Sequence, residues 1–141
     1  MKLENYNNDL AKKAASSHTH AITAINAGYT TYTSSDGTAK RYYRTYADGV
    51  KEEYGYSSYS SVGFTKGLGS LYFNDNNGNS FKMGLQYSYT TIYSIELVAE
   101  ASGALLGATV LDKGSNYFRF WFWSGSSITA KCGIHWHVIG K

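Results

Sequence analysis

Residues 41 to 55, RYYRTYADGVKEEYG, consist of two aromatic, alternating stretches joined by Ala47-Asp48-Gly49. Asp-Gly accepts the positive φ angles that a tight strand-reversing turn requires, so this stretch predicts a β-hairpin with strands near 40–46 and 50–56. Both faces of its first strand carry aromatic residues, and neither is a plain apolar core. Because an isolated hairpin is marginally stable in water, we expect it to pack on neighbouring chains or on the domain that follows.

The rest of the composition also favours strands. The chain has 141 residues and a mass of 15.6 kDa, enough for one ordinary domain and a short appendage. It contains 14 Tyr, 6 Phe, 3 Trp and 15 Gly but no Pro. Aromatic residues and Thr, punctuated by Gly, Asn and Ser, are typical of an all-β protein.

Charge and hydropathy exclude several classes of protein. The formal net charge is +3, the isoelectric point is near 8.9, and basic residues never cluster, so we expect no nucleic-acid partner. No window of about 18 apolar residues predicts membrane insertion. The polar start MKLENYNNDL lacks the apolar region of a signal peptide. The single Cys132 has no partner for an intrachain disulfide, which fits folding in a reducing cytoplasm.

Three segments are expected. Residues 1–37 form an N-terminal segment, in which 1–17 are helix-like but too short for a coiled coil. This start is either a frayed terminus or the lower end of a trimeric shaft, and 18–37 favour short strands. Residues 38–60 are the hairpin, expected as a collar, and 61–141 an antiparallel β-sandwich of about six strands, spaced as in such folds. The expected strands are 69–73, 81–89, 93–99, 108–111, 116–124 and 128–139, the last interrupted near Gly133.

The strand at 116–124 has two different faces. Three phenylalanines alternate along one face and predict core: Phe118, Phe120 and Phe122. The opposite face carries Tyr117, Arg119, Trp121 and Trp123. That face is too aromatic to stay in water, and aromatic planes with Arg suit both a subunit interface and a glycan or receptor platform.

The last expected strand carries His135-Trp136-His137. If Trp136 faces the core, both histidines face outward. Hydrogen-bonded histidines at a strand surface or trimer interface, ligand contacts and metal ligands all remain open. Protonation near neutral pH would make such an interface sensitive to acid.

No enzymatic constellation stands out. A glycosidase needs two carboxylates at a defined separation, and the acidic residues here are scattered through turns and strands. Cys132 and His135 would point to opposite faces of a regular strand, so they pair poorly as nucleophile and base. We expect a protein that is not an enzyme.

Two parts of the sequence resemble phage proteins. The hairpin is similar to the Tyr-Arg-x-Tyr-x-Asp-Gly-x-x-Glu segment found ahead of the terminal β-domain in phage tail-fibre and receptor-binding proteins. SIELVAEASG at 94–103, NYFRFWFWS at 116–124 and IHWHVIGK at 134–141 resemble the H-type lectin-like domains of phage fibre tips. His137 departs from that pattern, because an apolar residue is commoner there.

The resemblance implies a function. Such proteins are homotrimers of six-stranded sandwiches, and several bind carbohydrate. We therefore expect a distal tail-fibre protein of a virion, assembled in the host cytoplasm, that contacts other tail proteins and a host cell-surface carbohydrate. The alternatives are a purely structural trimer and, less favoured, a polysaccharide depolymerase.

His18-Thr19-His20 is a candidate metal motif. On a strand both imidazoles would share one face, with their Cα atoms roughly 6.5 to 7 Å apart. A three-fold axis would gather about six imidazoles, which suits Fe(II) or another transition metal better than tetrahedral zinc. The pair resembles the His-x-His motifs of phage fibres, and the alternative is two exposed histidines.

Overall fold

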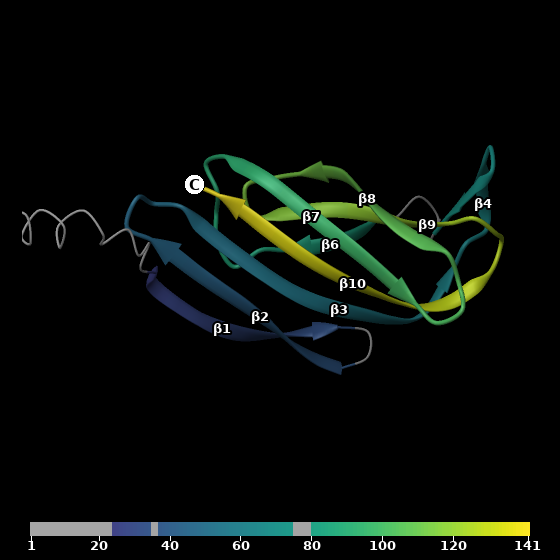
Figure 1. Ribbon diagram of the computed structural model, residues 1–141, viewed down its shortest axis with the longest axis horizontal. Coiled ribbons are helices and arrows are strands. Elements are labelled where there is room, and N and C mark those ends of the chain that lie inside the picture. The colour runs from purple at the N-terminus through teal and green to yellow at the C-terminus, as the bar shows by residue number, and fades with distance from the viewer. Residues whose placement is uncertain (1–23, 35–36, 75–79) are drawn as a thin grey trace, which may run out of the picture.

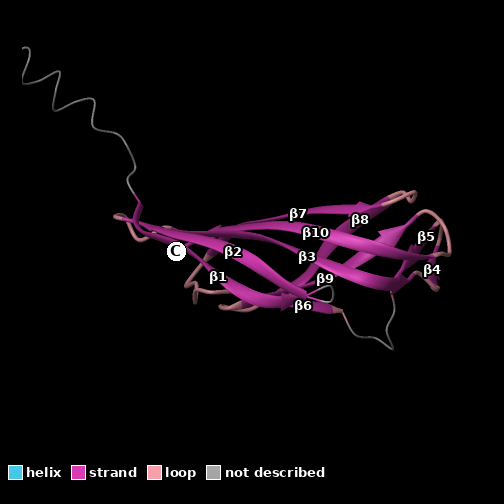
Figure 2. Cartoon of the chain, turned by 90° about the horizontal axis from the view of Figure 1, so that it is seen from below, coloured by secondary structure: helices cyan, strands magenta, loops and turns pink. Residues whose placement is uncertain are grey.

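The computed structural model describes residues 24–34, 37–74 and 80–141, which form a β-sandwich of two antiparallel sheets (Figure 1). The first sheet has the strand order β1-β2-β3-β10-β7. Its strands are β1 (Ala24–Ser34), β2 (Gly37–Tyr46), β3 (Lys51–Gly63), β10 (Thr129–Gly140) and β7 (Ile92–Ala101). The strands run along the long axis of the molecule (Figure 2).

The second sheet is built around β9 (Tyr117–Ser124), which pairs with β5, β6 and β8. The other strands are β4 (Lys66–Leu68), β5 (Leu71–Phe73), β6 (Phe81–Gly84) and β8 (Leu106–Lys113). The expected all-β antiparallel sandwich is confirmed. The described residues form ten strands: β5 to β10 correspond to the six expected at 61–141, β2 and β3 to the expected hairpin, β1 lies in the segment expected to favour short strands, and β4 is additional. Among the described residues, no helix is long and apolar enough to cross a membrane.

The predicted hairpin is present. At its turn, the Gly49 amide donates to the Tyr46 carbonyl at 3.0 Å, and Gly49 has a φ of 84°. The Asp48 carboxylate accepts the Val50 amide at 3.0 Å. These contacts are the turn chemistry expected of Asp-Gly, since Gly adopts positive φ without a steric penalty and Asp accepts a nearby backbone amide.

The hairpin lies within the sandwich. β3 pairs with β10 from Lys51 opposite Gly140 to Gly63 opposite Thr129. The boundary expected between a collar at 38–60 and a sandwich at 61–141 therefore falls inside β3. The aromatic hairpin obtains its partner from the C-terminal strand of its own chain, a pairing that no local sequence pattern specifies.

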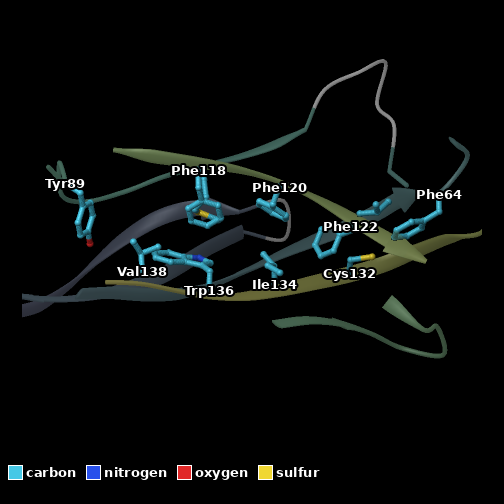
Figure 3. Close-up of a cluster of buried hydrophobic side chains, with 11 residues drawn as sticks. Phe64, Tyr89, Phe118, Phe120, Phe122, Cys132, Ile134, Trp136 and Val138 are labelled. Atoms are coloured by element: carbon cyan, nitrogen blue, oxygen red, sulfur yellow. The ribbon is translucent and has the colours of Figure 1, made fainter. Parts of the chain in front are cut away.

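The core lies between the two sheets (Figure 3). The predicted face of β9 is fully buried, with Phe118, Phe120 and Phe122 each 0% exposed. They pack with side chains of β10, among which Ile134 and Val138 are also 0% exposed. The remaining buried members of this cluster are Val62, Phe64, Met83, Tyr89, Cys132 and Trp136.

Two expected strands differ in detail. β6 ends at Gly84 instead of continuing to 89, because the amides of Gln86 and Tyr87 donate to the buried carboxylate of Glu53 at 2.8 and 3.3 Å and not to a neighbouring strand. β10 runs through Gly133 without a break, and its register shift against β3 lies between Ala130 and Cys132.

The described chain begins and ends at the same end of the sandwich. Ala24 pairs with Tyr46, and a Cβ added at Gly49 would lie 3.2 Å from the Lys141 side chain. The β4–β5 turn lies at the opposite end (Figure 1). The helix-like stretch 1–17, His18 and His20 fall outside the described residues.

Candidate functional site

The structure sorts the predicted site residues onto opposite outer surfaces of the sandwich. We call the outer surface of the β1-β2-β3-β10-β7 sheet the first face. It carries Tyr29, Lys40, Tyr42, Arg44, Glu52, Tyr54, Tyr56, Glu96, Val98, Glu100, His135 and His137. The outer surface of the other sheet, the second face, carries Tyr117, Arg119, Trp121 and Trp123. The division follows from alternation, because β9 and β10 each turn their buried residues toward the shared core.

One row of side chains crosses the whole first face. Strand register places Tyr29, Tyr42, Tyr54, His137 and Glu96 opposite one another on successive strands. Their ring centroids are 6.1, 5.3 and 6.4 Å apart from Tyr29 to His137. The three tyrosines are 56%, 42% and 37% exposed. The first face thus presents a continuous aromatic row that none of the described residues covers.

Glu52 is the centre of a polar cluster on this face. It accepts the Tyr46 hydroxyl at 2.7 Å, and it lies 3.3 Å from Arg44 Nε and 2.8 Å from His137 Nε2. Burial opposes ionisation of Glu52, but the hydrogen bonds from Tyr46 and His137 and the charge of Arg44 together lower its pKa. Arg44, Tyr46 and Glu52 belong to the phage-like hairpin signature, so part of that signature forms one contact cluster that reaches β10.

His135 lies beside a second carboxylate. Its Nε2 is 3.5 Å from Glu100 Oε2, and its ring centroid is 4.6 Å from that of Tyr56. The hydrogen bond from Tyr56 lowers the pKa of Glu100, despite the opposing effect of desolvation. His137 Nδ1 in turn lies 3.6 Å from Glu96. Within the described part of the chain, no group of three or more His, Cys, Asp or Glu is arranged to hold a metal ion.

On the second face, two aromatic side chains pack against glycines, one in β8 and one in the turn between β8 and β9. A Cβ added to Gly107 would lie 2.0 Å from the Trp123 indole, and one added to Gly114 would lie 2.4 Å from the Tyr117 ring. Gly107 is the direct cross-strand partner of Trp123. Both rings therefore bury part of their surface within this chain.

Trp121 lines a small hollow at the end of the sandwich away from Lys141. Its ring is 5.6 Å from that of Phe73, and Lys66, Gly67 and Leu68 complete a hollow of about 160 Å³. Leu68 is 71% exposed at its rim. Aromatic walls beside a cationic residue can hold the apolar face of a sugar ring and a polar or anionic substituent.

The charged residues of the second face lie near the start of β9, around Arg119. Arg119 lies 3.7 Å from Asp112, and the Lys82 ammonium sits 4.5 Å from the centre of the Tyr117 ring. Of the four site residues predicted on this strand, Trp121 alone belongs to the hollow lined by Phe73 and Lys66.

The buried charged residues Glu53 and Arg41 contact other residues inside the sandwich and do not line either outer face. Glu53 is 0% exposed and accepts the Tyr89 hydroxyl at 3.0 Å, while Arg41 Nε lies 3.9 Å away. Burial, followed by the Glu53 charge, raises the pKa of Tyr89. Burial also raises the pKa of the Cys132 thiol to about 11, so the thiol is neutral at physiological pH. Cys132 lies in the core and His135 on the first face, so the two form no catalytic pair.

Sequence reasoning missed most of the first face. The sequence alone does not identify Tyr29, Tyr54, Glu96 and Val98 as site residues, although each alternates with inward-facing neighbours. Alternation within one strand shows that two residues share a face. It does not show that four strands align their aromatic residues, which depends on register.

Comparisons with known proteins give two structural resemblances. An N-truncated R1-type pyocin tail fibre is 12% identical, with a TM-score of 0.47, and the match covers 91% of this chain and 96% of that one. A C-terminal portion of the Pseudomonas aeruginosa R1 pyocin fibre is 11% identical, with a TM-score of 0.48, covering 91% of this chain and 31% of that one. No protein-family model and no curated protein sequence matches the chain.

Proposed function

We propose that this chain is the distal part of a tail fibre of a phage or phage-like particle, a homotrimer that adheres to host cell-surface carbohydrate and is not an enzyme. The observation that supports it best is a single sandwich with aromatic residues on both outer faces. Exposed aromatic surface of this extent marks interaction sites. One face is available for other copies of the chain and the other for a ligand.

The sequence supports the same proposal independently. The hairpin signature and the three C-terminal segments resemble tail-fibre and H-type lectin-like proteins. In the structure, signature residues Arg44, Tyr46 and Glu52 contact one another, and Asp48 and Gly49 form the turn. A motif with this structural role suits a domain of the proposed kind.

The ligand site belongs to the hollow beside Trp121. Carbohydrate binding there would use the Trp121 and Phe73 rings for the sugar and Lys66 for a polar or anionic group. Adhesion would gain avidity because weak sites are repeated around a three-fold axis. The His18-His20 pair would hold Fe(II) or another transition metal on that axis, as the resemblance implies.

A glycan array of bacterial surface polysaccharides, probed with the purified trimer, tests the ligand site. Trp121→Ala should lower retention about tenfold, the loss expected for one stacking contact of roughly 1.4 kcal/mol. Tyr93→Ala is the matched control, since Tyr93 is 57% exposed on β7, away from the hollow. Retention that is unchanged by Trp121→Ala would contradict the site.

A purely structural trimer is the second candidate. It is favoured by the packing of Trp123 on Gly107 and of Tyr117 on Gly114, which leaves less aromatic surface for a sugar. A trimeric chain that binds no polysaccharide on the array would support this candidate. A monomer at micromolar concentration would contradict both.

A further inference from the structure

The first face exposes large apolar side chains on four of its five strands. β2 and β3 pair over five residues, from Arg41 opposite Gly55 to Thr45 opposite Lys51, so the part of the face common to all five strands measures roughly 19 by 17 Å, or roughly 300 Å². A stable interface buries about 800 Å² on each partner, so a contact here would also use the parts of the strands beyond this common area. The exposed side chains include Val98, 63% exposed, as well as the three tyrosines.

The arrangement of the tyrosines favours a protein over a sugar as the occupant. Tyr42 and Tyr54 stack at 5.3 Å with an angle of 15° between their planes. Their ring faces are therefore turned toward each other, and their edges and hydroxyls toward solvent. A sugar stacks on an open ring face, whereas a protein surface packs equally well against ring edges.

Apart from Glu52, which pairs with Arg44, and Lys131, which lies beside Glu100, the fixed charges of the first face lie in two strips. Lys40 and Arg44 lie on β2, beside the outermost strand β1, and Glu96 and Glu100 lie on β7, the strand at the other side of the sheet. The Glu96 and Glu100 side chains are 69% and 54% exposed, and that of Arg44 is 41% exposed. Each acid lies beside a histidine, Glu96 3.6 Å from His137 and Glu100 3.5 Å from His135.

We propose that the first face is where copies of this chain contact one another, with the Lys40 and Arg44 strip of one copy against the Glu96 and Glu100 strip of the next. Complementary charges fix the register of the contact, and the tyrosine row and Val98 form its apolar centre. In a three-fold ring each copy uses both strips, one toward each neighbour. This inference rests on the proposed self-association and adds the surface that carries it.

Charge reversal tests the inference, with molar mass measured by light scattering over a range of concentrations. Glu96→Lys with Glu100→Lys, and separately Lys40→Glu with Arg44→Glu, should each raise the concentration for half-dissociation by at least about a hundredfold, because like charges then meet. The four substitutions together should restore association. Lys82→Glu with Arg119→Glu, the same change of residue types on the second face, should leave the mass unchanged.

Arg44 pairs with Glu52, so Arg44→Glu could disturb folding as well as association. A second variant separates the two effects. Val98→Arg changes an exposed side chain without removing an ion pair, and it should also dissociate the assembly while the circular dichroism spectrum stays unchanged. Association unaffected by Val98→Arg and by both reversals would overturn the inference while leaving the trimer in place. A wild-type dimer that the reversals dissociate would support the interface and contradict the three-fold assembly. A wild-type monomer would overturn both.

Discussion

The two outer faces of the sandwich are both aromatic, but they differ in what their aromatic residues contact. On the second face, Trp123 and Tyr117 pack on Gly107 and Gly114. On the first face, Tyr42 has Tyr54 as its cross-strand partner, and Tyr54 has His137. An aromatic residue opposite glycine buries surface within its own sheet, whereas a row of aromatic residues stands away from the sheet. Tyr56 of the first face packs on Gly133 in the same way, so the contrast concerns the row of Tyr29, Tyr42 and Tyr54, which stays more exposed than the aromatic residues of the second face.

A substitution in the shared core should have the largest effect on stability, because both sheets pack against this core. Phe120→Ala removes a fully buried ring and should lower the free energy of unfolding by about 3–5 kcal/mol. Urea denaturation followed by circular dichroism measures this loss. Tyr93→Ala, at an exposed position, should change it by less than about 0.5 kcal/mol. Equal effects of the two substitutions would contradict the assigned core.

The contact between Gly107 and Trp123 on the second face can be tested by a single substitution. A Cβ at Gly107 overlaps the Trp123 indole, so Gly107→Ala should cost about 1–3 kcal/mol and shift the tryptophan emission. Gly84→Ala is the matched control, since nothing lies within 4 Å of its added Cβ. If Gly107→Ala lowered the stability no more than Gly84→Ala does, the indole of Trp123 would not lie against Gly107.

On the first face, Glu52 links the hairpin to β10. Because its pKa is lowered in the folded protein, its contribution to stability is present above its ordinary value of 4.5 and is lost as the pH falls through the folded-state pKa. Glu52→Gln should cost about 1 kcal/mol at pH 7. The difference from wild type should shrink below pH 4.5, which denaturation at several pH values measures. A pH-independent difference would exclude the carboxylate as its cause.

Cys132 tests the core at alkaline pH. Burial raises its pKa from 9.0 to about 11, so its contribution is present below pH 9 and is lost as the pH rises to about 11. Cys132→Ala should make the stability curve flatter between these values. A thiol that reacts rapidly with a disulfide reagent in the native protein at pH 8 would contradict its burial.

Local patterns in the sequence predicted much of the fold. Alternation identified the Phe118–Phe120–Phe122 face, and Asp48-Gly49 identified the turn. Pairings between distant segments could not be predicted, since the partnership of β3 with β10 depends on tertiary packing. The same limit applies to the site. The histidines of β10 and the tryptophans of β9 both alternate with buried residues, so the sequence pattern is the same for both sets. They lie on opposite faces because their strands belong to different sheets on either side of the core.

Oxidative footprinting tests most directly which face joins the copies. Hydroxyl radicals would label the wild-type assembly and the Glu96→Lys, Glu100→Lys variant, and mass spectrometry would compare the modification of individual side chains. Tyr29, Tyr42 and Tyr54 should be several-fold less modified in the assembly, with Trp121 equally modified in both. Protection of Trp121 with equal labelling of the three tyrosines would contradict the assignment of the two faces.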